Sequence, residues 1–198
     1  MHWLNLASRL PCTEVEGPGR RAAVWLQGCN KRCRGCCNPG YLQFVERELV
    51  SAQSVLDWLS DAHQAYDLEG VTFLGGEPML QAKGLAFIAQ GAQALGLSVM
   101  VFSGYTRAEL DELKLPGADQ LLRNTDVLVD GPYEAKLPDQ NRLWVGSTNQ
   151  QYHYLSRRYD PRIEKGEAID RAIEVHLDAR GSIFVNGWPE KIYSKLID

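Results

Sequence analysis

Short apolar runs recur along the first two thirds of the chain, at intervals that leave room for a helix between them. Each run is rich in aliphatic or aromatic side chains and lacks the polar alternation of a half-exposed strand. Such runs are typical of strands that are buried on both faces of a sheet. We therefore predict buried strands at residues 22–27, 71–74, 97–102 and 126–130.

Helical spacing of apolar residues fills the intervals between these runs. A first helix is predicted over residues 51–63, because the serine at its start can accept hydrogen bonds from the free N–H groups of the first turn. A second is predicted over residues 80–95, followed by Gly96, the residue type favoured just after a helix. Thr106 with Glu109 three residues later is a capping-box pattern that begins a third helix.

The alternation of strand and helix predicts an α/β fold in which helical crossovers connect the strands of a parallel sheet. A closed barrel of eight such units usually needs about 250 residues, whereas this chain has 198. We therefore expect a single domain over residues 1–198, built as an incomplete β/α barrel. Residues 173–177 and 182–185 alternate around a glycine-containing turn and predict a β-hairpin after the core. Residues 3–10 predict a short strand that Pro11 interrupts.

Charge and composition narrow the functional classes. The formal net charge of −4 provides no general attraction to nucleic acid, so a nucleic-acid substrate is disfavoured. The sequence has no apolar run of 18 residues and no basic, apolar leader, so we expect neither a membrane span nor secretion, and a cytoplasmic location. The five cysteines are an odd number and three are clustered, which favours metal chemistry in a reducing compartment over disulfides.

The clustered cysteines are the first candidates for chemistry. Cys29, Cys33 and Cys36 have the spacing C-x₃-C-x₂-C. Thiolates at such gaps hold iron–sulfur clusters, and three of them would leave one iron of a [4Fe–4S] cluster free for another ligand. A structural zinc site normally has four nitrogen or sulfur ligands, and Cys37 would supply the fourth. The spacing alone leaves both kinds of site open.

A second candidate directly follows the strand predicted at residues 71–74. The turn Gly75-Gly76-Glu77-Pro78 combines two glycines, which let a backbone approach a ligand closely, with a carboxylate that can accept a hydrogen bond from an ammonium group. By itself the turn is also typical of an ordinary connection between a strand and a helix.

Together, the cysteine spacing and the Gly-Gly-Glu turn resemble the radical S-adenosylmethionine enzymes. Other stretches resemble the activases of that family, above all the short activators of anaerobic ribonucleotide reductase and, less closely, of pyruvate formate-lyase. The resemblance covers roughly residues 12–155 and leaves residues 156–198 as an extension. The stretches that carry it are Glu16-Gly17-Pro18-Gly19-Arg20, Gln27-Gly28-Cys29, Asn38-Pro39, Gly104-Tyr105-Thr106 and Trp144-Val145-Gly146-Ser147-Thr148-Asn149-Gln150.

The resemblance implies a cofactor site at the ends of the strands. Cys29, Cys33 and Cys36 would hold a [4Fe–4S] cluster, whose free iron binds the amino and carboxylate groups of S-adenosylmethionine. No catalytic residue is expected beyond the cluster and the cofactor. The residues expected to bind or lie near S-adenosylmethionine are Gly75, Gly76, Glu77, Pro78, Ser103, Asp130, Asn149, Cys37 and Asn38.

The resemblance also implies an activity. In the activases, reduced flavodoxin or ferredoxin reduces the cluster, S-adenosylmethionine is cleaved to a 5′-deoxyadenosyl radical, and this radical abstracts hydrogen from a glycine of a partner enzyme. We therefore expect an oxidoreductase whose partner is a glycyl radical enzyme or another macromolecule. One alternative is a short enzyme of the same superfamily that acts on a small molecule or a peptide. The other is a non-catalytic iron–sulfur or zinc module.

Some cysteines and the C-terminal extension are not explained by this resemblance. Cys37 stands where the activases often have a histidine or an aromatic residue, and we expect a thiol near the cofactor there, not a fourth ligand. Cys12 is expected to be an inert, buried thiol. The hairpin, together with Trp188 and Pro189, is expected to contact a macromolecular substrate, and its alternative role is to cover an exposed sheet edge.

Overall fold

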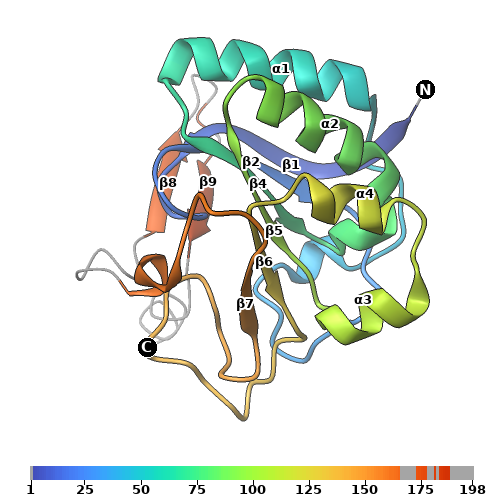
Figure 1. Cartoon of the computed structure of the whole chain (residues 1–198), viewed down its shortest axis with the longest axis vertical. Helices are drawn as coiled ribbons and strands as arrows, with labels where there is room; N and C mark the ends of the chain where they lie inside the picture. The colour runs from blue at the N-terminus through green and yellow to red at the C-terminus, as the bar shows by residue number, and fades with distance from the viewer. Residues whose placement is uncertain (1, 166–172, 178–180, 182, 188–198) are drawn as a thin grey trace.

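A seven-stranded sheet forms the centre of the computed structural model, which describes residues 2–165, 173–177, 181 and 183–187 (Figure 1). The strand order is β3-β1-β2-β4-β5-β6-β7, and β3 and β7 form separate edges, so the barrel is incomplete. The expected α/β fold is therefore confirmed. The parallel middle of the sheet consists of β2 (Arg21–Leu26), β4 (Gly70–Gly75), β5 (Ser98–Phe102) and β6 (Val127–Asp130).

Crossover helices connect these parallel strands. Because β2, β4, β5 and β6 follow one another in a single direction across the sheet, right-handed crossovers place the helices on the same face. Figure 1 shows α1, α2 and α4 side by side on that face. The expected caps are present, since Ser51 accepts from the backbone of Ser54 and Thr106 forms a capping box with Glu109. The helices are α1 (Ala52–Tyr66), α2 (Ala82–Ala94), α3 (Arg107–Leu113) and α4 (Ala118–Arg123).

Antiparallel strands extend the sheet at both ends. The strand β1 (Trp3–Thr13) continues past Pro11, so the expected end there is wrong. A register shift against β2 between Leu10 and Thr13 accommodates the proline, which has no N–H to donate to the ladder. Two further strands were not predicted: β3 (Glu48–Ser51), which pairs with β1, and β7 (Gln151–Tyr154), which pairs with β6.

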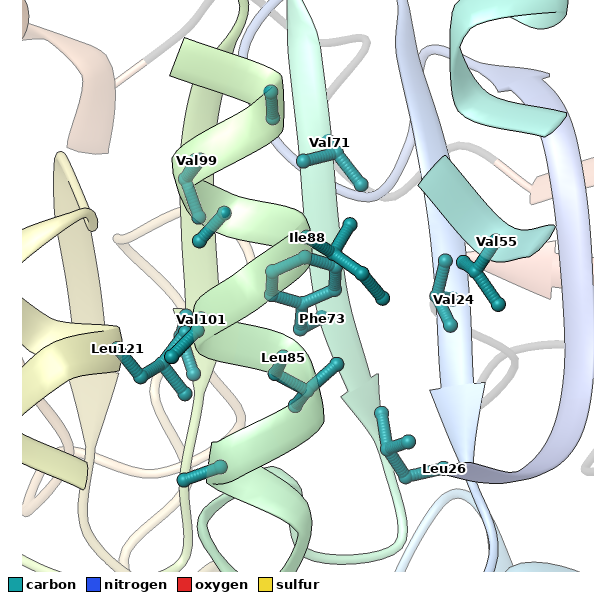
Figure 2. Close-up of a cluster of buried hydrophobic side chains, with 14 of the residues drawn as sticks. Val24, Leu26, Val55, Val71, Phe73, Leu85, Ile88, Val99, Val101 and Leu121 are labelled. Carbon is teal, nitrogen blue, oxygen red and sulfur yellow. The ribbon is translucent and has the colours of Figure 1, made fainter. Parts of the chain in front are cut away.

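The main hydrophobic core lies between the sheet and α2. Figure 2 shows Leu85 and Ile88 of this helix directed at Phe73 of β4, and all three side chains are fully buried. Small residues allow the close approach, since a Cβ at Gly84 would lie 2.8 Å from Leu4 Cδ2. This packing fixes the strands and, with them, the loops at their carboxyl ends.

The opposite face of the sheet carries aromatic side chains and the elements that follow the core. Trp25 lies on this face, and Phe184 packs against it edge-on with the ring centroids 5.6 Å apart. Phe184 belongs to the predicted hairpin, which consists of β8 (Ile173–Leu177) and β9 (Ile183–Gly187) and forms a separate two-stranded sheet. Trp188 and Pro189 lie outside the described residues.

Short 3₁₀ helices complete the described part of the chain. They are η1 (Pro39–Tyr41), η2 (Pro78–Gln81) and η3 (Pro161–Glu164), and each begins with a proline. The helix predicted at residues 80–95 is therefore divided into η2 and α2. Within the described residues, no helix has both the length and the apolar character needed to cross a membrane.

Candidate cofactor site

A cavity of about 730 Å³ opens at the carboxyl ends of β2, β4, β5 and β6, on the aromatic face of the sheet. Ligands of parallel α/β folds bind at this end of the strands, and the volume is in the usual range for small-molecule sites. Nine of the twelve residues predicted for the cofactor site line the cavity. They are Cys29, Cys33, Cys36, Cys37, Asn38, Gly75, Gly76, Glu77 and Ser103.

The cysteine loop is fixed at its start by backbone hydrogen bonds. The N–H of Gly28 donates to Tyr41 O at 2.8 Å, and that of Cys29 donates to Leu42 O at 3.1 Å. Gly28 has a φ of 96°, a conformation that glycine adopts without the strain of a Cβ. The loop therefore leaves β2 through a sharp turn and returns beside its own origin.

The Gly-Gly-Glu turn lies against the start of the cysteine loop. The N–H of Gly76 donates to Leu26 O at 2.7 Å, and that of Glu77 donates to Gly28 O at 2.9 Å. A Cβ at Gly76 would lie 2.4 Å from the same Gly28 oxygen. Glycine is thus required for the two segments to meet, and this contact places the turn and the thiols on one cavity wall.

The adjacent thiols of Cys36 and Cys37 differ in their protonation. A hydrogen bond from the Cys37 thiol lowers the pKa of Cys36 to about 6, although burial of Cys36 opposes the shift. The N–H of Asn38 also donates to Cys36 Sγ, at 3.4 Å. The same thiol contact raises the pKa of Cys37 well above its ordinary value. Cys36 therefore carries the thiolate of the pair and Cys37 keeps its proton.

Cys29 and Cys33 complete the thiol wall. Cys29 is buried and Cys33 half-buried. Burial raises the pKa of Cys33, the backbone of Tyr133 opposes the rise by hydrogen bonding, and charge on Cys36 and Cys29 adds to it, because these sulfurs are neighbours. No three Cys, His, Asp or Glu side chains of the described residues are grouped closely enough to hold a single metal ion.

Glu77 connects the turns after β4 and β5. Its side chain is almost fully buried, at 1% exposure. Oε1 accepts from the Met79 N–H and the Ser103 hydroxyl, each at 2.9 Å, and Oε2 accepts from the Gly104 N–H at 2.8 Å. Burial raises the pKa of Glu77 to about 7, while these donors and the positive charge of Lys31 act in the opposite direction.

This raised pKa predicts a pH-dependent stability. The folded protein keeps a proton on Glu77 up to about pH 7, whereas the unfolded chain releases it near 4.5. The contribution of Glu77 to the unfolding free energy therefore falls as pH rises from 4.5 through 7, by on the order of 3 kcal/mol. Glu77→Gln cannot ionise, so urea unfolding of wild type and variant at pH 5 and pH 8 should show this difference. Parallel pH profiles for the two proteins would contradict the assignment.

Lys31 was not among the predicted site residues, yet it lines the cavity. Its ammonium group lies 2.8 Å from Glu109 Oε1 and 4.0 Å from the centroid of the Tyr105 ring. Asn30 donates to the hydroxyl group of Tyr105 at 2.6 Å. These contacts fix the cysteine loop to the start of α3. No sequence pattern predicted the pairing, since Lys31 and Glu109 are 78 positions apart.

The cavity lining leaves out Pro78, Asp130 and Asn149, which were expected near the cofactor. Pro78 begins η2. Asp130 accepts from the Arg107 N–H at the start of α3, and its Oδ2 lies 2.9 Å from His153 Nε2. The amide of Asn149 donates to Pro132 O at 2.7 Å. Asp130 and Asn149 thus have structural contacts that do not involve the cavity.

Two segments that lie later in the chain supply the remaining cavity walls. The loop that connects β6 to β7 contributes Trp144, whose φ of 56° is unusual for a residue with a bulky side chain, and Arg142, which pairs with Asp139 at 2.7 Å. The hairpin contributes residues 184–187. The sequence did not predict the hairpin as part of the cavity wall, because nothing in its alternation indicates which surface it covers.

Comparison with known proteins identifies the family. A family model described as a 4Fe-4S single cluster domain matches residues 15–153. The chain belongs to this family. The match spans every residue predicted for the site, from Cys29 to Asn149, and includes the cysteine loop that lines the cavity.

Relatives with a more specific name are similar over most of their length. Anaerobic ribonucleoside-triphosphate reductase-activating proteins of Pasteurella multocida and Vibrio cholerae are 32% and 30% identical to this chain, over 74% and 76% of it and 95% and 97% of their own sequences. The protein of the same name from Escherichia coli K12 is 27% identical over 77% of this chain and 99% of its own. The resemblance to these activators is thereby confirmed.

A solved structure shows a weaker likeness. The crystal structure of QueE from Escherichia coli matches with a TM-score of 0.44 and 16% identity, over 52% of this chain and 54% of that chain. A likeness at this level adds nothing to the assignment of the family.

Proposed function

We propose that this protein is a radical S-adenosylmethionine activating enzyme that generates a glycyl radical on a partner, an anaerobic ribonucleotide reductase. One observation carries the proposal: three cysteines and the Gly-Gly-Glu turn line one cavity, inside the region that matches the 4Fe-4S single cluster family. The similarity to reductase-activating proteins over nearly their whole length supports the choice of partner.

The chemistry of the cavity wall fits both cofactors. Cys29, Cys33 and Cys36 would hold a [4Fe–4S] cluster, because soft thiolate ligands select such clusters and Cys36 already has a lowered pKa. Cys37 keeps its proton and donates a hydrogen bond to Cys36. It would therefore lie beside the cluster and adjust the properties of the ligand Cys36 without being a ligand itself. When bound, the cluster and S-adenosylmethionine supply the one-electron chemistry that removes hydrogen from the substrate.

The chain's own residues would bind and orient the methionine part of S-adenosylmethionine. Glu77 Oε2 accepts a single hydrogen bond from the described residues, that of Gly104, so it retains capacity for an ammonium donor. Ser103 and Met79 hold the other carboxylate oxygen in place. An ammonium group beside Glu77 would favour its anion, and the binding of S-adenosylmethionine would then release a proton near pH 7.

The apolar part of the wall would exclude water from the cofactor. Trp25, Phe102 and Trp144 line the cavity together with Phe184. A wall of this kind lowers the local polarity and protects reactive species from side reactions.

The electron donor is proposed to be reduced flavodoxin or ferredoxin, in the cytoplasm. Arg32 and Arg34 are exposed on the cysteine loop, next to the proposed cluster ligands. Exposed basic residues attract acidic partners over a range of about 10 Å at 0.1 M ionic strength. Reduction by such a donor should therefore slow as salt is added.

Anaerobic reconstitution tests the proposed function. The protein with iron, sulfide, dithionite and S-adenosylmethionine should form 5′-deoxyadenosine, and addition of the anaerobic ribonucleotide reductase should produce a glycyl radical signal in electron paramagnetic resonance. Cys33→Ala serves as the inactive control. If 5′-deoxyadenosine forms but the reductase acquires no radical, the partner is wrong. If none forms, the enzyme class itself is wrong.

A second candidate function is supported by the walls of the cavity. Several residues between Tyr133 and Gly146 line the cavity together with residues 184–187, so the cavity has walls besides those that the sheet provides. A site of this kind also suits a radical S-adenosylmethionine enzyme that acts on a small molecule or peptide. Transfer of deuterium from a deuterated low-molecular-weight compound into 5′-deoxyadenosine, without a partner protein, would favour this candidate.

A further inference from the structure

We propose that the outer face of the C-terminal hairpin docks the glycyl radical enzyme, through an aliphatic surface of that enzyme beside its glycine-bearing loop. This inference rests on the proposed function and adds the place where the partner binds. The face, here called the aliphatic ladder, consists of Val175, Leu177, Ile183 and Val185.

The face of the hairpin that is exposed to solvent carries aliphatic side chains, although polar side chains are usual at such positions. In the two-stranded sheet, Val175 pairs with Val185 and Leu177 pairs with Ile183, so all four side chains project from the same face. Their exposed fractions are 61%, 47%, 71% and 68%, respectively. Isolated apolar residues on a surface are ordinary, but a contiguous group in cross-strand contact is typical of an interaction site.

The inner face of the hairpin is anchored to the core. The Asn186 amide donates to Thr13 Oγ1 at 2.9 Å, and the N–H of Gly187 donates to Glu16 Oε1 at 3.0 Å. Glu174 Oε1 accepts from the Glu14 N–H at 2.7 Å. Together with the contact between Phe184 and Trp25, these bonds fix the hairpin beside the N-terminal segment, from which it is distant in sequence (Figure 1). The ladder is thus held in a defined position.

The ladder reaches the cavity at one residue, Val185. Val185 lines the cavity and is also exposed, and its neighbours Phe184, Asn186 and Gly187 form part of the same wall. A protein segment that occupies the cavity beside this wall would contact Val185. The part of that protein outside the cavity would then face Ile183 and Leu177. The substrate glycine must reach the cofactor through the cavity, so the enzyme that carries it is the partner best placed to cover this face.

The hairpin lies outside the region that matches the family model. The family match ends at residue 153, before β7 ends, and the three relatives cover 95–99% of their own length while matching about three quarters of this chain. A feature outside the shared region that contacts the shared cavity is suited to selecting a particular partner. The alternative role, covering a sheet edge, does not take the form of strand pairing in the described residues, because β8 and β9 pair with each other and not with the seven-stranded sheet.

The test replaces the outer pair by charges of opposite sign. Leu177→Lys with Ile183→Glu keeps a favourable cross-strand pair, so the hairpin should remain folded while its outer face becomes polar. The matched control is Leu95→Glu with Leu113→Lys, two exposed leucines on the helical side of the molecule. Each protein is reconstituted anaerobically, and its affinity for the anaerobic ribonucleotide reductase is measured by biolayer interferometry.

We expect the ladder variant to bind the reductase at least tenfold more weakly and the control to bind it with unchanged affinity. Without the reductase, both variants should form equal amounts of 5′-deoxyadenosine. Unchanged affinity of the ladder variant would overturn the proposal. Two further results with partner binding intact would also overturn it. A different oligomeric state of the variant by light scattering would mean that a second copy covers the face, and a lower melting temperature would mean that this chain itself covers it. Failure of the proposed function is distinct: the wild type itself would give the reductase no glycyl radical.

Discussion

Replacing Cys33 by alanine should abolish the [4Fe–4S] cluster, with complete loss of its visible absorbance, and should also abolish the formation of 5′-deoxyadenosine. The physical reason is that the three thiols of Cys29, Cys33 and Cys36 share one cavity wall, and no other cysteine of the described residues lines it except Cys37. Iron and sulfide content after anaerobic reconstitution measures the loss.

The control variants are Cys12→Ala and Cys37→Ala. Cys12 does not line the cavity, and burial raises the pKa of its thiol, so its removal should leave iron content unchanged. Cys37 keeps its proton in the pair with Cys36, so its removal should retain the cluster while changing the environment of one ligand. A Cys37→Ala protein that loses iron as fully as Cys33→Ala would refute the three-cysteine site and favour a four-thiolate site.

Local signals in the sequence predicted the elements that hold this wall. The strands β2, β4, β5 and β6 are continuous apolar runs because both of their faces are covered, and such runs are recognisable without any knowledge of the fold. The helix caps at Ser51 and Thr106 were also predictable, since each depends on a residue only three positions away in the sequence.

The edges of the sheet could not be predicted in this way. The strands β3 and β7 have four residues each and are only partly buried, so their sequences carry little apolar pattern. Their pairing with β1 and β6 supplies the stabilisation that their own sequences lack. The strand β1 passes Pro11 for a similar reason, since its pairing with β2 at Leu10 and at Thr13, before and after the proline, outweighs one missing donor.

Residue types at the site were predictable, but their contacts were not. The sequence predicted Glu77 near the cofactor from its two preceding glycines, yet its hydrogen-bond partners Ser103 and Gly104 follow a different strand. Asp130 also ends a strand, and its contact with His153 depends on the pairing of β6 with the unpredicted β7. Tertiary contacts thus decide which of two acidic residues at strand ends faces the cavity.

Gly76→Ala should disrupt the cofactor site far more than a methyl group added to Gly40, just after the cysteine loop. A Cβ at Gly76 would lie 2.4 Å from Gly28 O and 2.9 Å from Leu26 O, and both are backbone atoms that no rotamer change can move. The collision falls on the hydrogen bonds by which Gly76 and Glu77 join the start of the cysteine loop. The variant should therefore displace the loop itself, whereas the sequence had suggested a steric effect on S-adenosylmethionine alone.

The matched control is Gly40→Ala, because Gly40 lies just after the cysteine loop and a Cβ there would have no heavy atom within 4 Å. For Gly76→Ala we expect an unfolding free energy lower by about 1–3 kcal/mol, as for other overpacked sites, and S-adenosylmethionine affinity at least tenfold weaker. Iron content should fall in parallel, since the loop carries the proposed ligands. Urea unfolding and anaerobic calorimetry measure the two effects. If Gly76→Ala matches Gly40→Ala in both, the contact between turn and loop does not position the cofactor, and the turn has only a connecting role.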